Sequence, residues 1–187
     1  MRKSVLIAAA MISLLSACGE QVVENEAESA ATNNATATPA ATEKSAPPAA
    51  PATKQEALKI MHDRHEGMEQ IGKATKAIGQ QLKAENPNVG IIRTNAATIN
   101  DLAAKSENWF PAGTGPDVGK TRAKAEIWQK YDDFAANYRD FRVAAQALKG
   151  SADSADVNAI KPAFADLGKA CKACHDPYRA EEKKRDD

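Results

Sequence analysis

The residues best suited to chemistry lie together at positions 171–175, which read Cys-Lys-Ala-Cys-His. Two thiols three residues apart lie on the same side of one helical turn, so both can form thioethers to the two vinyl groups of a haem. The imidazole that follows is a strong ligand for haem iron in its neutral form. The pattern is the attachment signature of a c-type haem. It predicts one covalent haem c (iron) per chain, bound through Cys171 and Cys174 and ligated by His175.

Other interpretations of the same five residues are weaker. A structural zinc site needs four ligands, and the chain has no second cluster of Cys and His to complete one. A redox-active Cys-x-x-Cys belongs at a strand-to-helix junction, and no strand pattern lies nearby. A disulfide between such close cysteines would be strained and would constrain almost none of the chain.

The third cysteine, Cys18, follows a short apolar run at the N-terminus. Arg2 and Lys3 precede that run, which covers residues 5–15 and is too short to span a bilayer comfortably. The stretch Leu-Ser-Ala-Cys that ends at Cys18 resembles the processing site of a bacterial lipoprotein. It implies a signal peptide over residues 1–17, lipidation of Cys18, and a periplasmic protein anchored to a bacterial membrane. An ordinary signal peptide, with an incidental cysteine, is the alternative.

Composition divides the remaining chain into a linker and one folded domain. Residues 18–52 are rich in Ala, Thr, Pro and Glu and hold too few large apolar side chains to form a core, which predicts a disordered tether. Residues 53–187 carry 22 basic and 20 acidic side chains. This near balance gives no support for nucleic-acid binding, which requires a strongly basic face.

Apolar residues in the domain recur at steps of three and four, which predicts four helices and an all-α fold. An antiparallel four-helix bundle enclosing one covalently bound haem c is the economical arrangement, because both cysteines lie on the apolar seam of the last helix. The expected helices cover Thr53 to Ala84, Val89 to Asn108, Thr121 to Lys149 with Gly150 as the stop, and the chain from about Ser154 onward.

Several segments of the domain resemble the cytochrome c′ family, the class II c-type cytochromes. The resemblance covers nearly all of 53–187 and rests on the haem motif near the C-terminus followed by Asp-Pro-Tyr-Arg, on Arg64-x-x-x-Met68-x-x-Ile71-Gly72, and on the segments Trp109-Phe110-Pro111, Gly113-Thr114-Gly115 and Glu126-Ile127-Trp128. It implies a possible homodimer. The near-neutral charge of the domain predicts that its redox partner proteins dock only weakly and transiently.

The resemblance also implies two possible functions, which differ in the sixth ligand of the iron. In one branch Met68 matches the distal position, the iron is six-coordinate with His and Met ligands, and the protein transfers electrons. In the other, the iron is five-coordinate and binds NO or CO. Packing without ligation is the alternative role of Met68. Rival ligands on the same helix are Met61, His62 and His65.

Two arginines are candidate partners of the haem propionates. Arg64 is polar on an apolar seam, one turn before Met68, so a propionate could pair with it; otherwise its guanidinium would reach the surface. Arg179 follows His175 by one turn and could lie beside the imidazole or a propionate. No acid–base or nucleophile constellation indicates an enzyme. A weak peroxidase would need a distal proton acceptor, for which His65 is the only nearby candidate.

Overall fold

The computed structural model describes residues 45–181 of the chain, so the predicted signal peptide, Cys18 and most of the predicted linker lie outside the described residues. The described part is helical and contains no strand beyond one isolated bridge. None of its helices is both long and apolar enough to cross a membrane. The helices are α1 (Lys54–Lys83), α2 (Val89–Lys105), the 3-10 turn η1 (Ser106–Asn108), α3 (Glu126–Gln129), α4 (Tyr131–Asp153) and α5 (Val157–Tyr178).

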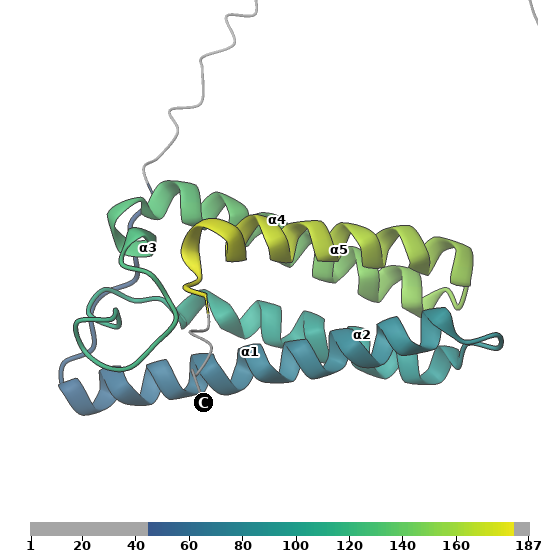
Figure 1. Ribbon diagram of the computed structural model, residues 1–187, viewed down its shortest axis with the longest axis horizontal. Coiled ribbons are helices and arrows are strands. Elements are labelled where there is room, and N and C mark those ends of the chain that lie inside the picture. Colours follow the sequence, from purple (N-terminus) through teal and green to yellow (C-terminus); the bar gives the residue numbers. More distant parts are fainter. Residues whose placement is uncertain (1–44, 182–187) are drawn as a thin grey trace, which may run out of the picture. The chain divides into compact units, whose positions relative to one another are not determined.

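The four long helices form an antiparallel bundle, which confirms the predicted fold class (Figure 1). α1 packs along α2, α2 along α4, and α4 along α5. α1 and α5, by contrast, share no extended backbone packing. Short turns join α1 to α2 and α4 to α5, whereas the connection from α2 to α4 is long and covers one end of the bundle (Figure 1). The backbones of α1 and α5 thus lie further apart than those of the three pairs that pack along each other.

Local sequence signals explain where the first helix begins and ends. The Thr53 hydroxyl accepts a hydrogen bond from the Glu56 amide, and the Glu56 carboxylate accepts one from the Thr53 amide. This reciprocal pair is the capping box expected from the sequence. Asn88 caps α2 in a related way by accepting from the Ile91 amide.

The apolar seams predicted from the sequence form the core of the bundle. Fully buried aliphatic side chains come from every long helix and interdigitate in one continuous cluster. The aromatic side chains gather at the end where the long connection lies, around Phe110, Phe134 and Tyr138. The fully buried large aliphatic side chains are Ile78, Ile92, Ile99, Ile127, Leu148, Ile160 and Leu167.

The predicted third helix starts later than expected. Residues 121–125 are not helical, because backbone hydrogen bonds tie them to the end of α5: the Lys124 amide donates to the Tyr178 carbonyl at 2.9 Å, and the Ala180 amide to the Arg122 carbonyl at 2.8 Å. Only four residues of α3 follow, and Lys130, whose backbone is not helical (φ −125°, ψ 51°), separates them from α4. Periodicity alone could not show this, since these hydrogen bonds join residues more than fifty positions apart.

The end of the same helix was also predicted incorrectly. Gly150 lies inside α4, which runs on to Asp153. The chain turns instead at Ala155, whose φ of 62° places it in the left-handed region. That conformation favours glycine, so the glycine signal lay five residues away from the residue that makes the turn.

The strained Ala155 generates a stability prediction. Ala155→Gly should raise the free energy of unfolding by about 0.5–1 kcal/mol, because glycine adopts a positive φ without the Cβ clash. The change is measured by denaturant unfolding of the haem-loaded protein. Ala147→Gly, an exposed position inside α4, is the control and should lower the free energy of unfolding by about 1 kcal/mol. Destabilisation by both substitutions would contradict the strain at Ala155.

Candidate functional site

The two thiols of the motif lie on the inner side of α5. Cys171 and Cys174 are free and half-buried, and both pack against the core cluster of the bundle. Burial raises the pKa of Cys171, and burial followed by the charge of Cys171 raises the pKa of Cys174 to about 11. The thiols are thus held as neutral groups facing apolar surroundings. Tyr138 of α4 and Tyr178 of α5 are nearby, and their pKa values are raised mainly by burial and to a smaller extent by Cys174.

The imidazole of His175 lies in the last turn of α5, where the chain is fastened to the long connection. The backbone carbonyl of His175 accepts a hydrogen bond from the Arg179 amide at 3.0 Å, and the Arg122 Nε donates one to the Ala180 carbonyl at 3.0 Å. Desolvation lowers the pKa of His175, and the positive charges of Arg179 and Arg122 lower it further. These surroundings favour neutral imidazole, the form that ligates iron.

Met68 is the half-buried methionine of α1, and it packs against the same core cluster as the two cysteines. The other methionine of the predicted distal region, Met61, is buried, and its thioether packs close to Gly119 in the long connection. Met61 is therefore engaged with the connection, and Met68 is the more suitable of the two as a distal ligand.

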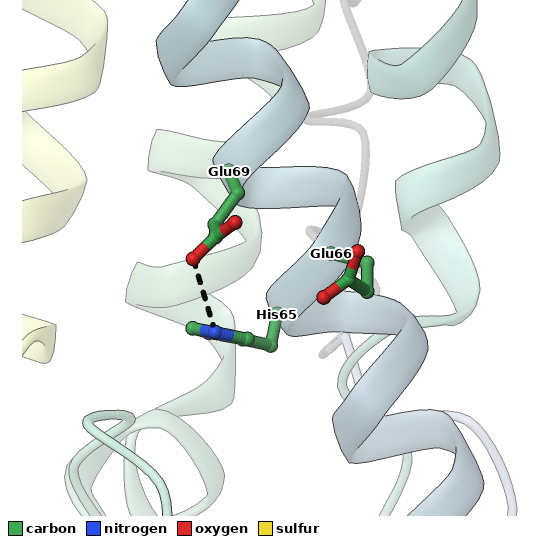
Figure 2. A group of neighbouring side chains, drawn as sticks. All are labelled: His65, Glu66 and Glu69. Atoms are coloured by element: carbon green, nitrogen blue, oxygen red, sulfur yellow. Dashed lines mark ion pairs between the residues drawn. The ribbon is translucent and has the colours of Figure 1, made fainter.

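The histidines of α1 are poor candidates for a distal ligand or a proton acceptor. His62 and His65 are both exposed. Figure 2 shows His65 beside Glu69, with 3.3 Å between the His65 Nε2 and a Glu69 carboxylate oxygen. Glu69 also pairs with Lys73, so this is a solvated ion-pair network of the kind common on helix surfaces. The exposure of His65 leaves a peroxidase activity without structural support.

The guanidinium of Arg64 is the buried cation of the described residues, with 5% of the residue exposed. Its Nη1 donates to the Trp109 carbonyl at 3.0 Å, and its Nη2 donates to the Thr114 carbonyl at 3.1 Å and to the Thr121 hydroxyl at 3.3 Å. The same group lies over the ring of Phe110, 4.9 Å from its centroid. Burial lowers its pKa to about 10.

These contacts give Arg64 a structural role that the sequence did not indicate. The guanidinium does not reach the surface, and its hydrogen bonds fasten the long connection to α1. Pairing of Arg64 or Arg179 with a haem propionate remains a prediction. The partners of Arg64, which are Trp109, Thr114 and Thr121, were missed because they lie 45 to 57 residues away and only the fold brings them together.

The residues present fit a covalently attached haem. Two free thiols and a neutral imidazole within one helical turn are the complete donor set of the attachment signature. The thiols face the inside of the bundle, on the helix that shares no extended backbone packing with α1. A helical bundle with this donor set defines the class of four-helix c-type cytochromes.

Comparison with known proteins identifies the family. The family model described as Cytochrome C′ matches residues 59–179, and the chain belongs to that family. The cytochrome c′ of Allochromatium vinosum is 33% identical over 143 residues, which cover 61% of this chain and 93% of that protein. Cytochromes of this family carry one covalent haem c per chain, which confirms the predicted cofactor.

Solved structures agree with the same assignment. The crystal structure of cytochrome c′ from Thermochromatium tepidum superposes with a TM-score of 0.63 at 33% identity and covers 71% of this chain and 100% of that one. A second cytochrome c′, described as having a ligand-controlled dimer dissociation, superposes with a TM-score of 0.62 at 31% identity, with the same coverage.

The buried guanidinium generates a second stability prediction. Arg64→Met should lower the free energy of unfolding by roughly 2–4 kcal/mol, because it leaves the Trp109 and Thr114 carbonyls buried without their donors. Guanidinium chloride unfolding of the haem-loaded protein, followed by circular dichroism, measures the loss. The matched control is Arg142→Met, which removes a half-exposed arginine paired with Glu107 and should cost less than about 1 kcal/mol. Equal losses of unfolding free energy would contradict the role of Arg64 in fastening the long connection to α1.

Proposed function

We propose that this cytochrome transfers electrons, with His175 and Met68 as the axial ligands of a haem joined to Cys171 and Cys174. The observation that carries the proposal is the position of Met68: it is half-buried against the core that also receives both cysteines. The haem iron supplies a one-electron Fe(III)/Fe(II) couple. A thioether favours Fe(II), so ligation by Met68 would raise the reduction potential.

The protein's own residues support this role in two further ways. The backbones of α1 and α5 share no extended close packing, and a flat ring between Met68 and the two cysteines would lie between these two helices. Among the described residues, the two histidines nearest Met68 in α1, His62 and His65, are both exposed and so do not place a buried acid or base beside it. With nearly balanced charge, docking of redox partner proteins would be weak and transient.

Ligand binding by a five-coordinate iron is the second candidate. The related cytochrome c′ with a ligand-controlled dimer dissociation favours it, since a ligand acts on that protein. In that case Met68 would pack over the distal side without ligating, and the chain could form a homodimer in the same manner. The absorption spectrum separates the two candidates: low-spin ferric iron supports electron transfer, and high-spin ferric iron supports ligand binding.

Met68→Ala tests the electron-transfer proposal. The wild type should be low-spin and bind CO slowly, whereas the variant should become high-spin, have a lower potential and bind CO faster. If displacement of Met68 costs about 1.4–2.8 kcal/mol, CO binding should accelerate about 10- to 100-fold. Stopped-flow spectroscopy measures the rate, and Met61→Ala is the control that should leave the spectrum unchanged. A Met68→Ala protein with wild-type spectrum and CO rate would refute ligation by Met68.

The proposal also includes export to the periplasm and lipidation of Cys18, which lies outside the described residues. Mass spectrometry of the mature N-terminus from the membrane fraction should find an acylated Cys18. Cys18→Ser should release soluble cytochrome or leave unprocessed precursor, because several acyl chains are needed for stable anchoring. Deletion of residues 30–40, which leaves the processing site intact, is the control and should keep the protein at the membrane. A mature chain that starts elsewhere would refute lipidation.

A further inference from the structure

Gly67, the residue before Met68, lies directly beneath the indole of Trp109. It is buried in α1, and a Cβ built at this position would overlap Cη2 and Cζ2 of that ring and lie 3.1 Å from Cζ3. Real Cβ atoms do not approach other atoms this closely, so only glycine lets the indole rest on the helix backbone here. The contact therefore depends on the missing side chain.

The indole has little freedom to move away from α1. Trp109 is 9% exposed, and its carbonyl accepts a hydrogen bond from the buried Arg64 at 3.0 Å. The ring of the next residue, Phe110, packs edge-on against Phe134 and Tyr138, with centroids 4.7 and 5.6 Å apart. The connection thus presses a fixed aromatic ring onto α1, one residue before Met68.

The other described glycines of α1 lack this constraint. A Cβ at Gly72 would meet nothing within 4 Å, and a Cβ at Gly79 would make an ordinary contact, 3.5 Å from the Phe164 ring. Among these three glycines of α1, only Gly67 makes such a close approach. Glycine inside a helix lowers the stability of that helix. At position 67 this cost accompanies the space that the indole occupies.

We propose that Gly67 and Trp109 position Met68 on the distal side of the haem. They do so by setting the distance between α1 and the long connection and the rotation of α1 about its own axis. The inference deepens the proposed function and rests on the distal placement of Met68. Gly67 and Trp109 act through Met68, so they are positioning residues. A methyl group at position 67 must push either the indole or α1 aside, and movement of α1 carries Met68 with it.

The test uses the haem-loaded full chain and the variant Gly67→Ala. The ferric spectrum and the rate of CO binding to the ferrous protein report the distal side, and the Nε1 proton resonance of Trp109 in the CO form reports the indole. The CO rate should change about tenfold, which corresponds to a distal displacement worth about 1.4 kcal/mol. Gly72→Ala is the matched control, and its spectrum and rate should equal those of wild type.

A second-site variant separates positioning from general damage to the fold. Trp109→Phe removes the ring that lies on Gly67, so it should alter the CO rate by itself. In Gly67→Ala/Trp109→Phe the methyl group takes the vacated space, and the rate should return to within about threefold of wild type, a strongly non-additive result. If Gly67→Ala fails to mature, Trp109→Phe and the double variant decide the question.

The outcomes distinguish this inference from the proposed function. A Gly67→Ala protein with wild-type spectrum and CO rate, or additive effects of the two substitutions, overturns the positioning role, whatever Met68→Ala does. A high-spin wild type, or a Met68→Ala protein identical to wild type, overturns ligation instead. With a high-spin wild type, the positioning role is judged by the CO rate alone, because the bulk of Met68 still limits access to a five-coordinate iron. A Met68→Ala protein identical to wild type in spectrum and CO rate overturns the positioning role as well, because Met68 then has no effect to transmit.

Discussion

The buried positive charge of Arg64 is the constraint on which the site end of the bundle depends. A guanidinium that has lost its water must recover hydrogen bonds, and here the backbone carbonyls of the long connection between α2 and α4 supply them. One side chain thereby joins α1 to a segment with little regular structure of its own. The cost of burying the charge is offset by these hydrogen bonds and by the ring of Phe110, whose centroid lies 4.9 Å from the guanidinium.

The haem side shows a different use of burial. Surroundings that raise the pKa of both cysteines and lower that of His175 keep all three groups neutral. Neutral thiols suit an apolar seam, so Cys171 and Cys174 can face the interior without leaving buried charge. The two attachment cysteines therefore lie half-buried in apolar surroundings, whereas His175 lies at the exposed end of the motif.

Much of the fold could be predicted from the sequence because its determinants are local. Periodicity located the four long helices, and the Thr53 capping box marked the start of α1. The haem motif was recognisable because its residues are adjacent in sequence. The two ends of the third helix were predicted incorrectly for different reasons. The bridge between 122–124 and 178–180 shortened its start. The turn after it is made at Ala155, which lacks the glycine that usually marks such a position. The partners of Arg64 were hidden for the same reason as the bridge, since both depend on distant contacts.

The bridge also bears on the order in which the chain can fold. The α1–α2 and α4–α5 hairpins join neighbours in sequence, so closing them costs little chain entropy. The Arg122–Ala180 and Lys124–Pro177 hydrogen bonds close loops of 58 and 53 residues. Contacts between residues so far apart in sequence are expected to form later than local ones. We therefore expect the last turn of α5, which holds His175, to be fastened after both hairpins have formed, which would keep the attachment residues accessible for covalent modification while the rest of the bundle assembles.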